Sequence, residues 1–175
     1  MVKILSIRVV DRIKESGHTQ DVLSKHASLI KLRLGFHELS EDRCSREGYI
    51  LLYLRNDEEG IKNLMDDLDR IYGIELQHMN LAQEANKEHI IPVESTIAVA
   101  GLIINNRSEI VRDVQKALTA FGCTIRTRLG INEVDYGEDT GLILLELFGE
   151  HGEMNGLIKR LNNINNVSVG VISFS

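Results

Sequence analysis

Two stretches decide the fold because they repeat one another: residues 30–38 read IKLRLGFHE, and residues 125–133 read IRTRLGINE. Five of the nine positions are identical at an offset of 95 residues. Upstream, the same offset aligns three further identical pairs: Arg12 with Arg107, Gln20 with Gln115, and Leu23 with Leu118. The chain therefore contains an internal duplication, and each copy is expected to form the same structural unit.

Downstream of this stretch the offset changes to 93 residues, where residues 48–54 (GYILLYL) align with residues 141–147 (GLILLEL). A change of two residues between two strands predicts hairpin loops of different length. Between the copies lies a polar segment that carries the only proline, Pro92. We therefore predict two domains, residues 1–82 and 95–175, joined by a linker over residues 83–94.

Copy two shows the order of elements clearly. Apolar β-branched residues predict strands, and apolar residues at helical spacing predict helices. The predicted elements are a strand over 96–104, a helix marked by Ile110, Val114, Leu118 and Phe121, a hairpin from 124–134 and 141–148, a helix marked by Leu157, Ile158, Leu161 and Ile164, and a strand over 167–174. The order is βαββαβ.

The start of the first helix differs between the copies. In copy two, Asn106 and Glu109 form a candidate capping pair, and Gly122 closes the helix. In copy one, Ser16 and Gly17 replace Val111 and Arg112. Because glycine and serine are weaker helix formers, we expect the first helix of copy one to begin later or to fray.

A βαββαβ unit of this length packs two helices on one face of a four-stranded antiparallel sheet. The predicted fold class is therefore α+β, with two tandem ferredoxin-like domains. The repeated apolar positions predict a core that occurs twice, from Leu34, Leu52, Leu64, Leu68 and Ile71 in copy one and from Leu129, Leu145, Leu157, Leu161 and Ile164 in copy two.

The central strands are apolar on both sides, because Tyr49, Leu51 and Tyr53 alternate with the core positions of copy one, as Leu142 and Leu144 do in copy two. A second layer is therefore expected over the helix-free face. It could be the sheet of the sister domain, the same face of a second chain, or both. We expect a homodimer formed through sheet faces.

Composition narrows the possible functions of this 175-residue chain. A net charge of −6 disfavours nucleic acid as a partner, because few cations are in excess to contact a phosphate backbone. The sequence contains no run of 18 apolar residues, so no membrane span is predicted. A cytoplasmic protein is therefore expected. Its two cysteines, Cys44 and Cys123, are too few for a disulfide framework and are expected to be reduced thiols.

Residues 97–174 resemble the iron-only hydrogenase system regulator family in three features: the run Arg128-Leu129-Gly130-Ile131, the strand that begins at Gly141, and the Leu-x3-Leu-x2-Ile helix before Val167. Copy one resembles it too, although a tandem arrangement departs from the family. That family is similar in fold to ACT domains and to the ligand-binding domain of the nickel-responsive regulator. The resemblance implies an ACT-like, ligand-sensing regulatory module linked to iron-only hydrogenase maturation or regulation.

The first candidate site is the repeated Arg-Leu-Gly-x-x-Glu motif, with Arg33 and Gly35 in copy one and Arg128 and Gly130 in copy two. A guanidinium can hold a carboxylate through two hydrogen bonds, and glycine lets a ligand approach the backbone. The alternative is structural: the glycines form a bulge in an edge strand, and the charges are solvated.

The second candidate site is the loop after the first strand, Asp11-Arg12 and Asn106-Arg107. The ACT resemblance implies an amino acid or small anion bound here, against the start of the following helix. The Pro-Gly pair that normally follows in ACT domains is missing. Asp11 and Asn106 are alternatively helix caps.

A metal site is the third candidate. His37 and Cys44 flank the hairpin of copy one, and imidazole with thiolate suits a soft metal. The resemblance to the nickel-responsive domain points to the same strand, but two ligands are fewer than a site needs. No nucleophile elbow, HExxH or phosphate loop is present. We thus expect no enzymatic activity and no cofactor. A ligand-sensing module is favoured over a metal sensor, a structural oligomerisation protein and an enzyme.

Overall fold

The computed structural model describes residues 3–37, 45–84, 87–95, 97–132 and 137–174. The chain divides into two compact units: the first ends at His78, and the second begins at Met79. Each unit is built from one copy of the repeat.

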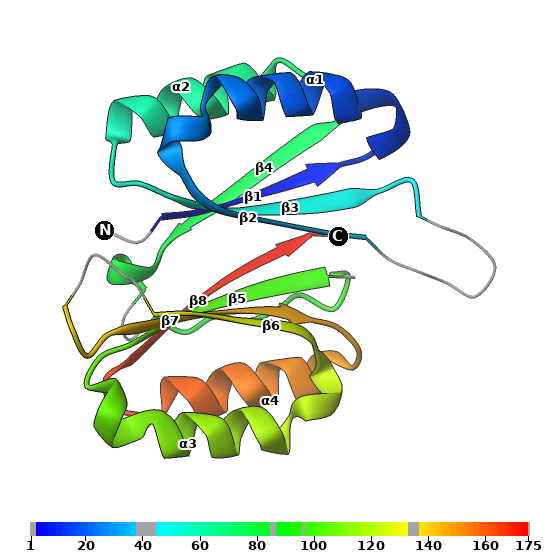
Figure 1. Cartoon of the computed structure of the whole chain (residues 1–175). Helices are drawn as coiled ribbons and strands as arrows, with labels where there is room; N and C mark the ends of the chain where they lie inside the picture. Colours follow the sequence, from blue (N-terminus) through cyan, green and yellow to red (C-terminus); the bar gives the residue numbers. More distant parts are fainter. Residues whose placement is uncertain (1–2, 38–44, 85–86, 96, 133–136, 175) are drawn as a thin grey trace. The chain divides into compact units, whose positions relative to one another are not determined.

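The first unit has a four-stranded sheet with strand order β2-β3-β1-β4, and β3 pairs antiparallel with both β1 and β2. Helices α1 and α2 lie on the same face of this sheet (Figure 1). The elements in chain order are β1 (Lys3–Val9), α1 (Arg12–Lys25), a 3-10 turn η1 (Ala27–Leu29), β2 (Ile30–Phe36), β3 (Gly48–Leu54), α2 (Glu58–Asp69) and β4 (Ile74–Asn80), whose last two residues belong to the second unit.

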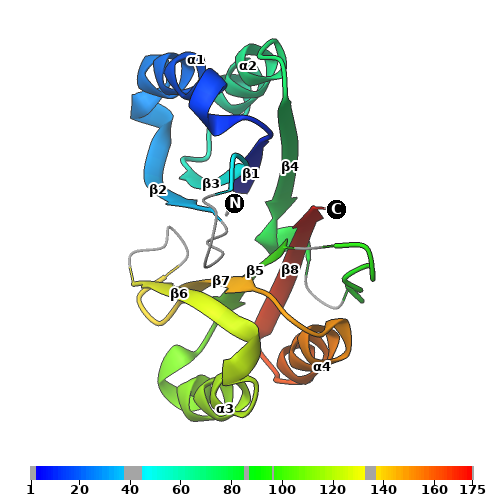
Figure 2. The ribbon, with the colours of Figure 1, turned by 90° about the vertical axis from the view of Figure 1, so that its right-hand side faces the viewer.

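The second unit repeats the arrangement, with strand order β6-β7-β5-β8 and helices α3 and α4 on one face (Figure 2). Its elements are η2 (Leu81–Gln83), β5 (Ile97–Ile104), α3 (Arg107–Ala120), η3 (Gly122–Thr124), β6 (Ile125–Ile131), β7 (Gly141–Leu147), α4 (His151–Asn162) and β8 (Val167–Phe174). The predicted fold class is confirmed: two tandem ferredoxin-like βαββαβ units.

The core of each unit lies between the helices and the sheet. Six leucines that the repeat aligns are fully buried there: Leu52, Leu64 and Leu68 in the first unit, and Leu145, Leu157 and Leu161 in the second. The prediction was wrong for Leu34 and Leu129. They pair with Leu51 and Leu144, so they lie on the opposite face of the sheet, because side chains alternate along a strand.

Helix α1 begins at Arg12, the counterpart of Arg107 in α3, so the expected late start of α1 was wrong. The Asp11 side chain accepts a hydrogen bond from the Lys14 N–H at 3.3 Å. Its carbonyl also accepts from the Glu15 N–H at 2.9 Å. This N-cap fixes the first turn and outweighs the poor helix propensity of Gly17.

The segment between the repeats packs on the second unit. Ile91 is buried in its core, and the backbone of Ile91 is held by both ends of the Asn155 side-chain amide in α4, at 2.8 and 3.2 Å. Leu81 is buried against Gly101 and Gly170, which pair across β5 and β8. A Cβ would lie 2.9 Å from Leu81 at Gly101 and 2.7 Å at Gly170. Met79 lies at 3.3 and 2.8 Å from the same two Cβ positions, so the paired glycines form a notch that Leu81 and Met79 fill together.

The helix-free faces carry the apolar residues that suggested a second layer. Leu51, Tyr53, Leu142 and Leu144 are each buried. The homodimer stays a prediction. None of the helices in the described part of the chain has the length and apolar character that a bilayer crossing requires.

The junction between α1 and α2 is held by charges. One oxygen of Asp67 accepts from Lys25 at 2.7 Å and from His26 at 2.8 Å, and the other accepts from Arg70 at 3.1 Å. The hydrogen bond from His26, followed by that from Lys25, lowers the pKa of Asp67 to about 2. This carboxylate is therefore more stable as an anion in the folded chain than in the unfolded chain.

We predict that replacing Gly170 by Ala lowers the free energy of unfolding by about 1–3 kcal/mol, because the added Cβ would lie 2.7 Å from Leu81 and 2.8 Å from Met79, two buried side chains that would have to shift. The matched control is Gly17→Ala in α1, where a Cβ meets nothing within 4 Å. That variant should gain about 0.5–1 kcal/mol from helix propensity. Urea unfolding measures both, and an unchanged or more stable Gly170→Ala variant would contradict the packing of Leu81.

We also predict that Asp67→Asn is destabilising in a pH-dependent way. Because folding lowers the pKa of Asp67, its contribution is fully present above the unfolded pKa of about 3.9 and is lost as the pH falls toward about 2. The difference in unfolding free energy between wild type and variant should therefore be largest near neutral pH and should shrink in acid. Asp66→Asn, which removes an exposed pair with Lys62, is the control and should have little effect. An Asp67→Asn loss that stays constant with pH would refute this origin.

Candidate functional site

The arginines of the repeated motif point toward the helices. Arg33 pairs with Leu52 and Arg128 with Leu145, so both side chains lie on the core-facing side of an edge strand. Arg33 donates to the Gln20 side-chain oxygen at 2.6 Å, and Arg128 donates to that of Gln115 at 2.9 Å. The recurrence of these arginines thus has a structural reason, because each ties an edge strand to the first helix of its unit.

The glycines of the motif do not form bulges. Gly35 pairs in register with Ile50, and Gly130 with Ile143. The ladder is irregular earlier, between Ile30 and Leu32 and between Ile125 and Thr127. The glycine-bulge alternative was therefore wrong, although β2 and β6 are the end strands that it assumed. A Cβ at Gly130 would meet no atom within 4 Å, so this glycine leaves space open on the helix-facing side.

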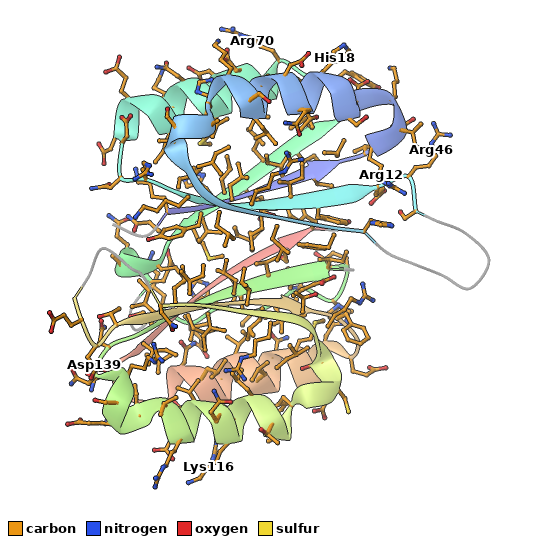
Figure 3. The ribbon with its side chains drawn as sticks, viewed as in Figure 1. Arg12, His18, Arg46, Arg70, Lys116 and Asp139 are labelled. Atoms are coloured by element: carbon orange, nitrogen blue, oxygen red, sulfur yellow. The ribbon has the colours of Figure 1, made fainter. Side chains whose placement is uncertain are left out.

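At the start of α1, both predicted residues bind the hairpin of the first unit. The Arg46 guanidinium donates to Asp11 at 2.6 Å, and this hydrogen bond is the main reason that the pKa of Asp11 is lowered. Arg12 donates from Nε to the Ser45 carbonyl at 2.9 Å. Figure 3 shows Arg12 and Arg46 at the same end of the first unit. Asp11 is thus a helix cap, as its structural alternative predicted, and an ion-pair partner.

The start of α3 is built differently. Asn106 has a φ of 52° and makes no side-chain capping bond, so its expected side-chain cap on the helix was wrong. Its backbone carbonyl accepts from the Glu109 N–H instead. The cap comes from Asp139, which accepts from the Ser108 N–H at 3.0 Å and from the Ser108 hydroxyl at 2.7 Å. These bonds lower the pKa of Asp139, which lies beside the start of α3 (Figure 3).

Sequence reasoning missed Asp139. Its counterpart at the offset of 93 is Arg46, so the two copies carry opposite charges at this position. In the first unit, the acid Asp11 lies at the start of α1 and the base Arg46 lies before β3. In the second unit, the acid is Asp139, which lies before β7. Because the residue type is not repeated and its partner is 31 residues away, no motif marks it.

Three predicted residues of the second unit, Arg107, Arg128 and Gly130, line one cavity of about 130 Å³ between α3, β6 and β7. Arg107 lies across the start of β7, where a Cβ at Gly141 would come within 3.1 Å of its Cδ atom. Its guanidinium donates to the Asn132 side-chain oxygen at 2.7 Å. The apolar part of the lining comes from Ile104, Val111, Val114, Ile131, Leu142 and Ile143. Asn106 is not part of this lining.

The two arginines of this cavity are bonded to neutral partners. Arg107 binds the amide of Asn132, and Arg128 binds the amide of Gln115. Among the residues that the structure describes, neither guanidinium forms an ion pair, and the cavity lining includes no acidic side chain. Asp139, outside the lining, has its pKa lowered first by its hydrogen bonds with Ser108 and also by the charge of Arg107. The cavity therefore carries two guanidinium groups, with one carboxylate near Arg107 and none in the described lining.

The counterpart positions of the first unit share the arginines but not the apolar floor. Ser16 and Thr19 stand where Val111 and Val114 stand in the second unit. The Thr19 hydroxyl donates to the Glu15 carbonyl within α1. A polar floor at the matched position means that the repeated arginines do not by themselves specify the same ligand in both units.

The metal prediction is only half covered by the structure. His37 follows β2 and is partly buried, whereas Cys44 lies outside the described residues, as do Glu38 and Glu133 of the repeated motif. Within the described ranges, no group of three or more His, Cys, Asp or Glu side chains could hold a metal ion. The metal site at His37 and Cys44 stays a prediction.

The fold defines an α+β protein of two tandem ferredoxin-like units. No protein-family model matches the sequence, and no curated protein matches it either. Solved structures with a similar fold include an uncharacterized protein from Thermotoga maritima, with 23% identity, a TM-score of 0.42, and coverage of 47% of this chain and 100% of that one.

Two further solved structures align over most of the chain. The small subunit of acetolactate synthase from Thermotoga maritima has 9% identity and a TM-score of 0.37, covering 100% of this chain and 98% of that one. The regulatory subunit of aspartate kinase from Thermus thermophilus has 6% identity and a TM-score of 0.39, covering 91% of this chain and 89% of that one.

Proposed function

We propose that this chain is a non-enzymatic, ACT-like regulatory module that binds a small anionic molecule in the cavity of the second unit. The observation that carries the proposal is the presence of Arg107 and Arg128 in one cavity whose described lining has no acidic side chain. Two guanidinium groups that face the same space repel one another, and a bound anion relieves that repulsion.

The side chains, rather than the end of the helix, would supply the binding contacts. The N–H of Ser108 is bonded to Asp139, and those of Glu109 and Ile110 are bonded to the Asn106 carbonyl. These donors at the start of α3 are therefore already satisfied. Each arginine uses one terminal nitrogen for an amide oxygen, and its remaining N–H groups are suited to a carboxylate or another oxyanion.

The cavity favours a ligand of few heavy atoms. Its volume of about 130 Å³ is below the ~300–1,000 Å³ that is typical of pockets for larger ligands. A small carboxylate, a small inorganic anion or a small amino acid satisfies this limit.

Ligand binding has a direct route to the neighbouring backbone. Asn132 holds Arg107 and follows β6, and Asp139 precedes β7 and caps α3. A ligand held by the remaining N–H groups of Arg107 would leave the bond to Asn132 in place and add a restraint between α3 and the end of β6. We propose this added restraint as the signal that the module transmits.

The resemblance of the sequence motifs is the only support for a link to iron-only hydrogenase maturation or regulation, so this link stays a hypothesis. The same holds for a homodimer formed through sheet faces. A metal-sensing role would need further metal ligands besides His37, because no group of three or more His, Cys, Asp or Glu side chains in the described ranges could hold a metal ion.

We predict that sodium salts of small anions, screened at low ionic strength, raise the thermal unfolding midpoint of the wild type. A ligand present at 100 times its Kd should add about 2.7 kcal/mol to the stability of the folded state. Arg107→Ala and Arg128→Ala should each abolish the shift. The matched variants Arg12→Ala and Arg33→Ala make the same changes in the first unit and should keep it. No shift with any anion, or equal losses in all four variants, would refute a site in the second unit.

A further inference from the structure

The lining of the cavity also discriminates between classes of small anion. Resting on the function proposed above, we infer that the site selects a short, branched aliphatic carboxylate that carries no ammonium group over the amino acid of the same shape.

The polar end suits a carboxylate. Arg107 and Arg128 come from α3 and β6, and Gly130 lies two residues after Arg128 on β6. A planar guanidinium presents paired N–H donors at the spacing of the two carboxylate oxygens. Because a Cβ at Gly130 would meet no atom within 4 Å, this glycine leaves room for the ligand near Arg128.

The floor suits a branched apolar group. Val111 and Val114 from α3 line it with Ile104 from β5 and Ile143 from β7. A hydrated inorganic anion gains nothing from this aliphatic surface, whereas a branched hydrocarbon displaces water from it. The first unit has Ser16 and Thr19 at the positions of the two valines, so the apolar floor is particular to the second unit.

An ammonium group has no suitable partner in this lining. The side-chain oxygens of Asn132 and Gln115 already accept hydrogen bonds from the two arginines. None of the described lining residues is acidic, and the Asp139 carboxylate near Arg107 already accepts two hydrogen bonds from Ser108, so an ammonium group would lie near two guanidinium groups without a carboxylate in the lining to pair with. Repulsion between like charges therefore disfavours the zwitterion.

The test compares isobutyrate with L-alanine by calorimetric titration of the full chain. The two molecules differ only in that a methyl group replaces the ammonium group. Isobutyramide removes the negative charge while keeping the shape, and acetate removes the branched group. We expect isobutyrate to bind at least tenfold more tightly than each of the other three.

Each outcome separates the two levels of the proposal. If L-alanine binds as tightly as isobutyrate, the selectivity is refuted and the anion site stands. If acetate binds as tightly as isobutyrate, the apolar floor plays no part and the inference fails in that respect. If none of the four compounds binds, and inorganic phosphate and sulfate do not bind either, the proposed function fails with it.

Two variants locate the binding. Gly130→Val fills the open space beside Arg128 and should abolish isobutyrate binding, whereas Gly35→Val makes the same change at the matched register position of the first unit and should not. The double variant Val111→Ser with Val114→Thr gives the second unit the floor residues of the first and should remove the preference for isobutyrate over acetate. Urea unfolding of each unliganded variant confirms that it is folded, and retained tight binding in Gly130→Val would refute this placement.

Discussion

The register in which β6 pairs with β7 is the constraint on which the cavity depends. Gly130 is opposite Ile143 and Arg128 is opposite Leu145. The Arg128 guanidinium and the open space left by Gly130 therefore both face α3. A slip of one residue would turn both toward the other face of the sheet and bring Leu129 under the helices. The bond from Arg128 to Gln115 opposes such a slip, since it is formed only when the arginine faces the helix. The same bond from Arg33 to Gln20 fixes β2 in the first unit.

The sequence was sufficient for the order of elements and the strand arrangement, because apolar periodicity and a duplicated pattern depend on residues that are close in the chain. The sequence also identified Arg107, Arg128 and Gly130 as candidate binding residues, and the structure places these three in one cavity. It failed where the partner is distant and its type is not repeated. Asn132 and Asp139 stand opposite His37 and Arg46 in the duplication, so comparing the copies could not mark them. The facing direction of Leu34 and Leu129 was missed because both sides of the central strands are apolar.

The two units solve the same local problems with different chemistry. Asp67, Lys25 and His26 hold α1 to α2 by charge, whereas at the matched junction of the second unit the ring of Phe121 lies against Gly156, where a Cβ would come within 3.0 Å. The capping acids also differ in position: Asp11 caps α1 from the start of that helix, whereas Asp139 caps α3 from the segment before β7. Backbone geometry is thus retained while side-chain contacts diverge, which leaves one copy able to gain a ligand preference that the other lacks.

Leu81 in its notch of paired glycines has a consequence for how the two halves can be separated. The leucine precedes the second sheet by more than a dozen residues, yet it is buried against Gly101 and Gly170 on that sheet. A second half that begins after residue 82, the predicted end of the first copy, would lose Leu81 and Met79 and leave the two adjacent glycines without these covering side chains. The junction between the copies is thus buried as part of the second half. A protein fragment made of the duplicated residues alone would lack the side chains that cover Gly101 and Gly170.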